Sequence, residues 1–266
     1  MNATKITALL LTIVLLTCTT VLAGPTAQIN IPSTDAKGLK EVAVSLGNYT
    51  RFSNKADAGT NSYSVSVETG LLPFEAVRLE VGGDYLTTGT NSAGDAHPFC
   101  FNAKLATAED LGFAGMPALA VGIYNLGTYD KPEVNGSTRQ NIAYLLAAKT
   151  LPVVGRLSVG GYYGSSRALA SDGNPSDTRN NSGFMASWDR SMNEISDKLW
   201  LGIDYMSGNN ANGEISVGGA WCFSKQVSLL AGVVWYNPFY NLSAGDNGAL
   251  PGGKPAFTTQ LTINLP

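Results

Sequence analysis

Charged residues recur at alternate positions in the segment 77–85. Arg78, Glu80 and Asp84 are separated by residues that are mostly apolar. Successive side chains of an extended strand point to opposite faces, so this segment would carry an ionic row on one face and an apolar row on the other. Such an ionic row could pair with opposite charges or border a path for water.

A glycine-centred version of this pattern occurs six times. The spacing of the glycines fits a repeating β-hairpin with its loops. Without side chains, they would allow tight curvature and leave room inside a narrow barrel. The six glycines, expected at similar heights on the inward face, are Gly47, Gly82, Gly122, Gly160, Gly202 and Gly232.

The same register predicts which polar side chains face the interior. We expect bases near one rim and a partly aromatic polar layer nearer the other. The candidate lining residues are Arg78, Glu80, Asp84, Lys104, Tyr124, Lys149, Arg156, Tyr162, Lys198, Asp204 and Glu214. Two interpretations stay open: the charges pair and nearly close the interior, or they border a water-filled path.

Residue types suited to catalysis or to metal binding are sparse. His97 is the single histidine, it lies beside Pro98, and no Gly-x-Ser-x-Gly motif occurs, so we expect no enzyme and no catalytic residues. The oxygen-rich run 172–177 lacks the later glutamate of a calcium loop, so we expect no metal and no cofactor. Cys100 and Cys222 would lie at opposite ends of a barrel, which predicts two free thiols.

Composition favours many short strands. The chain has 266 residues, 30 of them glycine, and only 14% are charged. After its N-terminal stretch, no apolar run is long enough for a spanning helix. With 17 Lys and Arg residues against 20 Asp and Glu residues, the net negative charge argues against a nucleic-acid partner.

The N-terminus has the order of a secretory signal. Lys5 precedes an apolar run over 8–16, and small residues lead to an expected cleavage after Ala23, so 1–23 is a signal peptide. A lipoprotein signal at Cys18 is a weaker alternative, because Thr17 stands where a smaller residue is preferred. We expect 24–37 to be a periplasmic segment; the alternative is that it folds back and plugs the interior.

From residue 38 to 266, the chain alternates between strands and turn signals. The predicted strands are 39–51, 62–70, 76–87, 98–107, 117–127, 141–150, 156–166, 183–191, 198–207, 213–223, 227–236 and 256–265. Short connections fall at one end of these strands, and mostly longer polar loops at the other. This sorting is typical of barrels that span an outer membrane.

The outward face of the predicted strands is apolar, and we place Ile142 and Leu146 on it with many valines and leucines. Aromatic residues would border this band as girdles in the lipid headgroup region. The expected girdle residues are Tyr63, Tyr85, Tyr144, Tyr163, Tyr205 and Trp235 near the loops, and Trp188, Trp221 and Phe223 near the turns. Singly, each could equally be a core residue of a soluble β-protein.

With these features, the chain from 39 to 265 resembles a small, porin-like bacterial outer-membrane β-barrel. The resemblance implies an all-β, closed, antiparallel up-and-down transmembrane barrel of about 12 strands in the outer membrane of a Gram-negative cell, with short periplasmic turns and longer extracellular loops. The chain departs from this family pattern at its C-terminus: such barrels commonly end in an aromatic residue, whereas this chain ends in Pro266.

The resemblance also implies a function. We expect a channel with a narrow charged lumen that passes small solutes, in contact with outer-membrane lipid. The alternative is a non-conducting barrel that anchors extracellular loops, docks a partner or sheathes one. The sequence leaves the solute, the oligomeric state and any periplasmic partner open.

Overall fold

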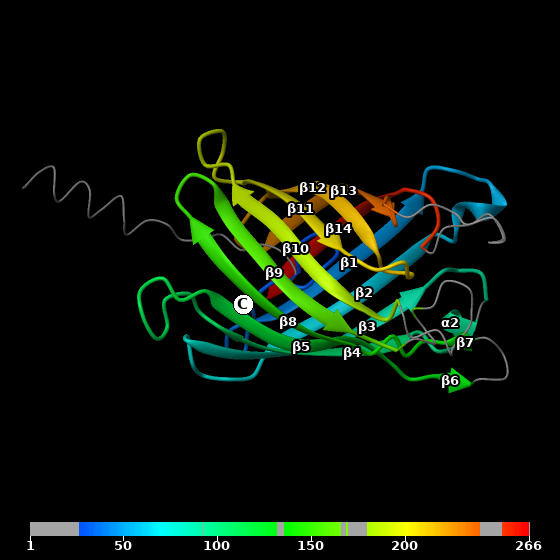
Figure 1. Cartoon of the computed structure of the whole chain (residues 1–266), viewed down its shortest axis with the longest axis horizontal. Helices are drawn as coiled ribbons and strands as arrows, with labels where there is room; N and C mark the ends of the chain where they lie inside the picture. The colour runs from blue at the N-terminus through cyan, green and yellow to red at the C-terminus, as the bar shows by residue number, and fades with distance from the viewer. Residues whose placement is uncertain are drawn as a thin grey trace, which may run out of the picture.

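The computed structural model describes residues 27–91, 93–131, 136–165, 169, 180–239 and 252–265. The predicted signal peptide and its cleavage site lie outside these ranges. The described chain forms one closed barrel of twelve strands, shown from the side in Figure 1. The strands are β1 (Val42–Arg51), β2 (Ser62–Gly70), β3 (Val77–Thr87), β4 (Phe99–Thr107), β5 (Ala118–Gly127), β8 (Ile142–Leu151), β9 (Gly155–Tyr163), β10 (Ser182–Ser191), β11 (Leu199–Met206), β12 (Glu214–Cys222), β13 (Val227–Tyr236) and β14 (Ala256–Leu265).

Every strand of the barrel pairs antiparallel with its neighbours along the sheet. The barrel closes where β1 pairs with β14, from Val42 opposite Leu265 to Arg51 opposite Ala256. Closure gives each strand a partner on both sides, which a barrel in hydrocarbon requires because no water is present to satisfy a free edge. The predicted all-β, up-and-down barrel of twelve strands is therefore confirmed, with boundaries that differ by at most a few residues.

The strands form because their side chains alternate between two environments. In β2, Val65 and Val67 are 43% and 47% exposed on the outer surface, whereas Ser64 and Ser66 line the interior. β-branched and aromatic residues favour strands, and here they also supply an apolar outer surface that suits lipid. The resemblance to outer-membrane β-barrels is confirmed at the level of architecture.

The connections between strands fall into two groups, one at each end of the barrel. At the turn end of the barrel, they are 71–76, 108–117, 152–154, 192–198 and 223–226; at the loop end, they are 52–61, 88–98, 128–141, 164–181, 207–213 and 237–255. The loop end carries a 3-10 turn, η1 (Ala56–Ala58), a short helix, α2 (Ala93–Ala96), and a two-stranded sheet of β6 (Asp130–Lys131) and β7 (Gly136–Ser137). No helix within the described ranges is long and apolar enough to cross a membrane.

Aromatic residues occupy both ends of the outer surface. Tyr63, Tyr85 and Trp235 are exposed near the loop end, as is the outward Tyr163, which is 64% exposed. Tyr205 is half-buried on the same face and packs its ring 5.4 Å from that of Phe184. Near the turn end, Trp221 and Phe223 are exposed, and Trp188 donates from Nε1 to the carbonyl of Val154 at 2.7 Å.

The face assignment was wrong for β8. Tyr144, expected in the girdle, and Ile142 and Leu146, expected on the outer surface, all point inward and are at most 6% exposed. Leu145, between them, is 60% exposed on the outside. This strand is apolar on both faces, so alternation could not distinguish the inner face from the outer one.

Candidate functional site in the barrel lumen

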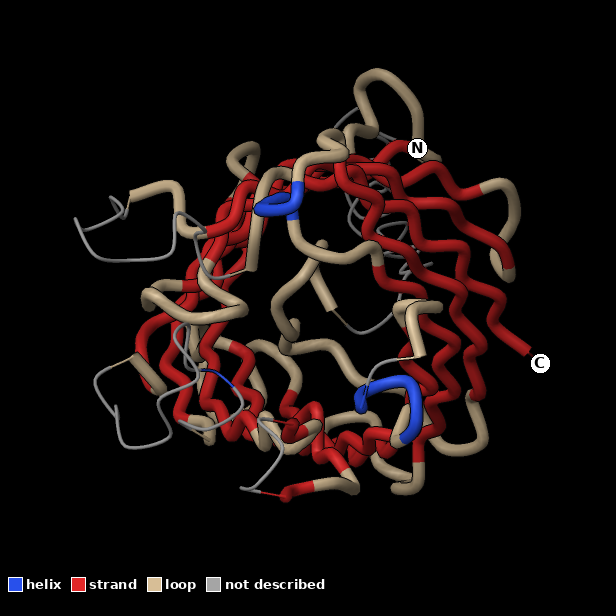
Figure 2. The backbone as a smooth tube through the Cα atoms, turned by 90° about the vertical axis from the view of Figure 1, so that its right-hand side faces the viewer, coloured by secondary structure: helices blue, strands red, loops and turns tan. Residues whose placement is uncertain are grey.

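The N-terminal segment, 27–37, lies inside the barrel. Figure 2 looks along the barrel and shows chain crossing the space that the strands enclose. A bridge joins Ala27 to Pro32, and the nitrogen of Gln28 donates to the carbonyl of Ile31 at 2.8 Å, which makes a tight hairpin. The expectation of a segment free in the periplasm was therefore wrong, because these residues contact inward-facing side chains of the barrel.

The tip of this hairpin is bound to Asp204 on β11. Oδ2 of Asp204 accepts hydrogen bonds from the backbone nitrogens of Ile29 at 2.9 Å, Asn30 at 2.8 Å and Ile31 at 3.2 Å. The side chain of Asn30 donates to Glu214 and accepts from the hydroxyl of Tyr49. Charged acceptors make stronger hydrogen bonds than neutral ones, so this arrangement fixes the tip midway along the lumen.

A second group of contacts holds the segment near the turn end. Arg156 donates from Nη1 to Asp35 at 2.6 Å and from Nε to Asp189 at 2.9 Å. Gln28 also donates to Asp189 at 2.9 Å, and Arg78 donates to the carbonyl of Ala36 at 3.0 Å. Arg78 and Arg156 therefore bind the segment in this structure.

Apolar side chains fill the lumen on the side of β5 to β11. Ile31, fully buried, packs in a cluster with Ile142, Leu146, Met185 and Met206. Ile29 packs separately beside Trp200 and Leu230, and a Cβ on Gly218 would lie 3.2 Å from its Cδ1. The inward face of β8 is apolar because it packs against the N-terminal segment rather than against water.

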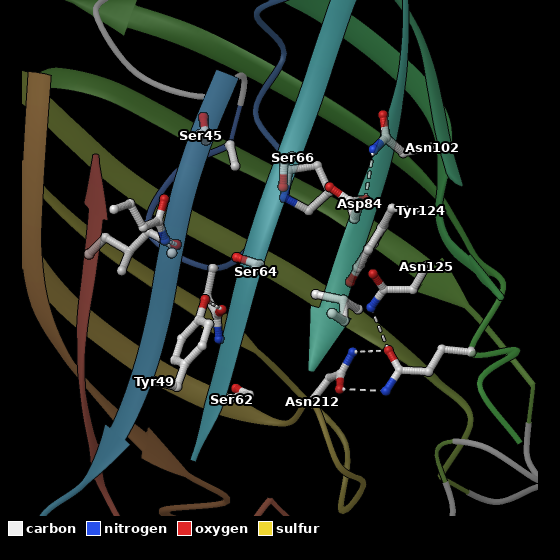
Figure 3. A pocket seen from close by; sticks show the side chains of 18 of the residues that line it. Ser45, Tyr49, Ser62, Ser64, Ser66, Asp84, Asn102, Tyr124, Asn125 and Asn212 are labelled. Carbon is white, nitrogen blue, oxygen red and sulfur yellow. Dashed lines mark hydrogen bonds between the residues drawn. The ribbon is translucent and has the colours of Figure 1, made fainter. Parts of the chain in front are cut away.

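The opposite side of the lumen, along β1 to β5, contains a polar cavity of about 410 Å³. Figure 3 shows serines of β2 beside polar side chains of β3, β4 and β5 on the same wall of the cavity. The lining from these strands includes Ser45, Tyr49, Ser62, Ser64, Ser66, Asp84, Asn102, Tyr124 and Asn125. This volume lies within the range of about 300–1,000 Å³ typical of small-molecule sites.

The lining extends from the loop end of the barrel toward the turn end. Arg51 and Tyr236 line its loop end, and Arg51 lies over the Tyr236 ring at 4.4 Å. Toward the turn end, Nζ of Lys104 lies 3.3 Å from Glu80, and Glu68 lines the wall beside them. The backbone nitrogen of Lys37 donates to Glu80 at 2.9 Å, so the N-terminal segment contributes to this inner end.

A bulge in β5 shapes one wall of the cavity. The pairing with β4 shifts between Phe101 and Ala103, and Asn125 takes a positive φ of 52°. An extra residue in one strand re-aims side chains, so Tyr124 and its neighbour Asn125 both line the cavity. Asn125 donates to Gln140 at 2.6 Å, and Gln140 donates to Asn212 at 3.2 Å, which forms an amide network at the loop end.

Most of the lumen residues inferred from sequence lie on the inward face, but their surroundings differ. Glu80, Asp84, Lys104, Tyr124 and Glu214 line the cavity. The remaining inward-facing predictions, Arg78, Arg156, Tyr162 and Asp204, do not line it. Three of them contact the N-terminal segment, whereas the Tyr162 hydroxyl donates to the carbonyl of Ser207 and accepts from Asn210.

Two predicted lumen lysines lie elsewhere. Lys149 belongs to the outer face of β8, where its Nζ contacts Asp110 at 2.8 Å and Glu109 at 3.2 Å at the turn-end rim. The hydrogen bond from Lys149 lowers the pKa of Asp110 below its ordinary value of 3.8. Lys198 is exposed in the turn before β11. The prediction for Lys149 was wrong because it shares the face error of β8, whereas Lys198 lies one residue before β11, at the turn-end rim and outside the cavity lining.

The inward glycines make room for neighbouring polar groups. A Cβ on Gly47 would lie 2.6 Å from Oγ of Ser64, and one on Gly82 would lie 2.5 Å from the Asn102 amide oxygen. On the other wall, a Cβ on Gly122 would lie 2.5 Å from the Tyr144 hydroxyl. The sequence analysis missed the serine row of β2, which alternation alone would have placed inward.

Groups that could hold a metal are absent from the described ranges, where no cluster of three or more His, Cys, Asp or Glu residues is suitably placed. Cys100 and Cys222 are buried and are not disulfide-bonded, which confirms the expectation of two thiols. His97 stacks on Tyr129 at 3.9 Å near the loop end and does not line the cavity.

No protein-family model matches the chain, and no curated protein sequence matches it. Several solved structures of outer-membrane proteins are similar. An outer-membrane channel from Pseudomonas putida F1 is 10% identical, with 87% of this chain and 97% of that chain covered and a TM-score of 0.46. The Salmonella typhi outer membrane phospholipase dimer with bound calcium is 14% identical, with coverage of 85% and 91% and a TM-score of 0.45. A mutant of the Rh. blastica porin is 12% identical, with coverage of 93% and 68% and a TM-score of 0.38. At these identities and TM-scores, the similarities concern general architecture alone.

Proposed function

We propose that this protein is an outer-membrane channel for small polar solutes, narrowed by its own N-terminal segment. The polar cavity along β1 to β5, of about 410 Å³, is the observation that supports this function. It extends from the loop end past the middle of the barrel. A bore of twelve strands that also holds residues 27–37 admits only small solutes.

The contrast between the two sides of the lumen favours a channel over an anchor. On the side of β5 to β11, the interior is packed with apolar side chains such as Leu146 and Met185. Along β1 to β4, small polar residues leave space unfilled. A barrel that served only as an anchor could pack both sides, because apolar packing is usually at least as stable as buried polar groups.

The N-terminal segment sets the width of the proposed path. The hydrogen bonds to Asp204 fix its tip, and the Arg156 ion pairs fix its base. We infer that small solutes pass between this segment and the β1 to β5 wall. The apolar outer surface and the closed barrel support an outer-membrane location in contact with lipid.

Planar-bilayer recording of the mature chain tests this proposal. The full chain should give small, discrete current steps, and a variant lacking 27–36 should give larger ones because the lumen is emptied. Lys149→Gln, on the outer face, serves as the control and should conduct like the parent. If neither the parent nor the deletion variant conducts while both fold as barrels, the anchoring alternative replaces the channel.

A further inference from the structure

The side chains that line the polar cavity indicate which class of solute it binds. This inference rests on the proposed function. Along β2, the hydroxyls of Ser62, Ser64 and Ser66 all line the cavity. Within the ranges that the structure describes, none of these three hydroxyls is hydrogen-bonded to another residue. Alternate residues of a strand are about 7 Å apart, so these hydroxyls form a row along the cavity.

The neighbouring strands β3 to β5 also offer polar groups to the cavity. Asn102 donates to Asp84 at 3.0 Å, and Asn125 belongs to the amide network at the loop end. The Tyr124 ring and Tyr49 line the same space. Hydroxyls, amides and carboxylates can each bond a hydroxyl of a solute, and an aromatic ring can pack against its apolar surface.

Most charged side chains that line the cavity already have a hydrogen-bond partner within the protein, and Lys104 and Glu80 form an ion pair. Lys104 contacts Glu80 at 3.3 Å, and Arg51 donates to the carbonyl of Lys254 at 2.8 Å. Glu214 is bonded by Asn30. Glu68 has one buried oxygen, Oε2, without a hydrogen-bond partner among the described residues. The groups that remain for a solute to bond are mainly the serine hydroxyls and the Glu68 carboxylate.

We propose that this cavity binds a neutral polyhydroxylated solute, a monosaccharide or a disaccharide. Such a solute carries closely spaced hydroxyls that each donate and accept, which matches the serine row and the neighbouring amides. A charged solute would need an unpaired opposite charge to replace its hydration. The volume of about 410 Å³ accommodates a ligand of this size.

Titration calorimetry of the detergent-folded mature protein with maltose tests the site directly. We expect saturable binding, and the combined substitutions Ser62→Ala, Ser64→Ala and Ser66→Ala should raise the Kd by roughly tenfold or more, because the hydrogen bonds from these hydroxyls to the sugar are lost. The matched control replaces Ser158, Ser187 and Ser228 with alanine; these serines are buried but lie outside the cavity lining. The control should bind maltose as the parent does.

Choline chloride is the competing probe, because it is a small organic cation. Binding of choline without binding of maltose would overturn the proposed solute class, as would equal maltose affinity in the parent and the triple β2 variant. Bilayer recording separates this inference from the channel itself. If the protein conducts and maltose neither blocks nor slows the current, the sugar site is contradicted but the channel is not. If maltose binds to a barrel that never conducts, the channel is contradicted but the sugar site is not.

Discussion

Asp204 on β11 holds the backbone of Asn30, whose nitrogen donates to Oδ2 of Asp204 at 2.8 Å. The two residues are 174 positions apart in the chain, so the contact ties the N-terminus to the second half of the barrel. The same oxygen also accepts from Ile29 and Ile31. A single carboxylate therefore fixes three consecutive residues of the segment that narrows the lumen.

Removing this carboxylate should free the tip of the segment. In Asp204→Ala, the amides of Ile29, Asn30 and Ile31 lose a charged acceptor, and a hydrogen bond to a charged group contributes about 1.5–3 kcal/mol. Hydrogen exchange of a peptide covering 27–37, measured by mass spectrometry, should accelerate on the order of 100-fold. Ser228→Ala, a buried inward substitution on β13 that leaves these bonds intact, is the control. Unchanged exchange in Asp204→Ala would show that other contacts hold the tip.

Arg156 and Lys149 allow a matched comparison, because each can lose one positive charge to glutamine. Arg156→Gln leaves Asp35 and Asp189 without their ion pair, so the lumen gains negative charge and the base of the segment is released. Reversal potentials under a salt gradient should shift toward cation selectivity. Lys149→Gln removes only ion pairs at the exposed turn-end rim, which contribute little, and should leave the reversal potential unchanged. Equal shifts in both variants would contradict the placement of these side chains.

Much of the fold could be predicted because alternation is a strong signal in most strands. β2, β13 and β14 occupy the predicted ranges, and in β2 and β14 the inward row is mainly polar or small while the outward row is mainly apolar. Turn residues and loop composition then predicted which end of the barrel carries the short turns and which end carries the longer loops. The barrel follows from local patterns because each strand repeats the same two environments.

The interior could not be predicted to the same extent. In β8, Tyr144 and Leu146 face inward because Ile31 packs beside them, and a contact between residues more than 100 positions apart leaves no local pattern. The short run around Ile29 and Ile31 gave little indication of its place in the lumen. The barrel residues that bind this segment, such as Asp204, were predicted to line the lumen. The excess of charged residues on the inward face was therefore the one sequence signal that a further segment binds there.

The corrected register of β8 can be checked by labelling. Leu145→Cys should place a spin label in lipid, since Leu145 is 60% exposed, whereas Leu146→Cys should place it in the packed interior, since Leu146 is fully buried. Oxygen, which concentrates in lipid, should relax the label at 145 several-fold more than the label at 146. Val159 and Ser158 on β9 supply a control pair with known outward and inward faces. A reversed order on β8 alone would restore the alternation inferred from sequence.

The loop end is tied across the barrel closure by Asp57 and Lys254, whose Oδ2 and Nζ atoms lie 2.8 Å apart. The hydrogen bond from Lys254 lowers the pKa of Asp57 below its ordinary value of 3.8. A carboxyl group with a lowered pKa favours the closed loops above the ordinary value, and this contribution is lost as pH falls through the lowered pKa. Limited proteolysis of loop 52–61 should therefore be slow at neutral pH and faster near pH 3.

Asp57→Asn should be cleaved faster already at neutral pH and should lose this pH dependence, while Lys55→Gln, a neighbour in the same loop, serves as the control. Cleavage of Asp57→Asn at the parental rate at neutral pH would show that the backbone bond from Lys254 to Ala58, at 2.9 Å, is sufficient to hold the loops together.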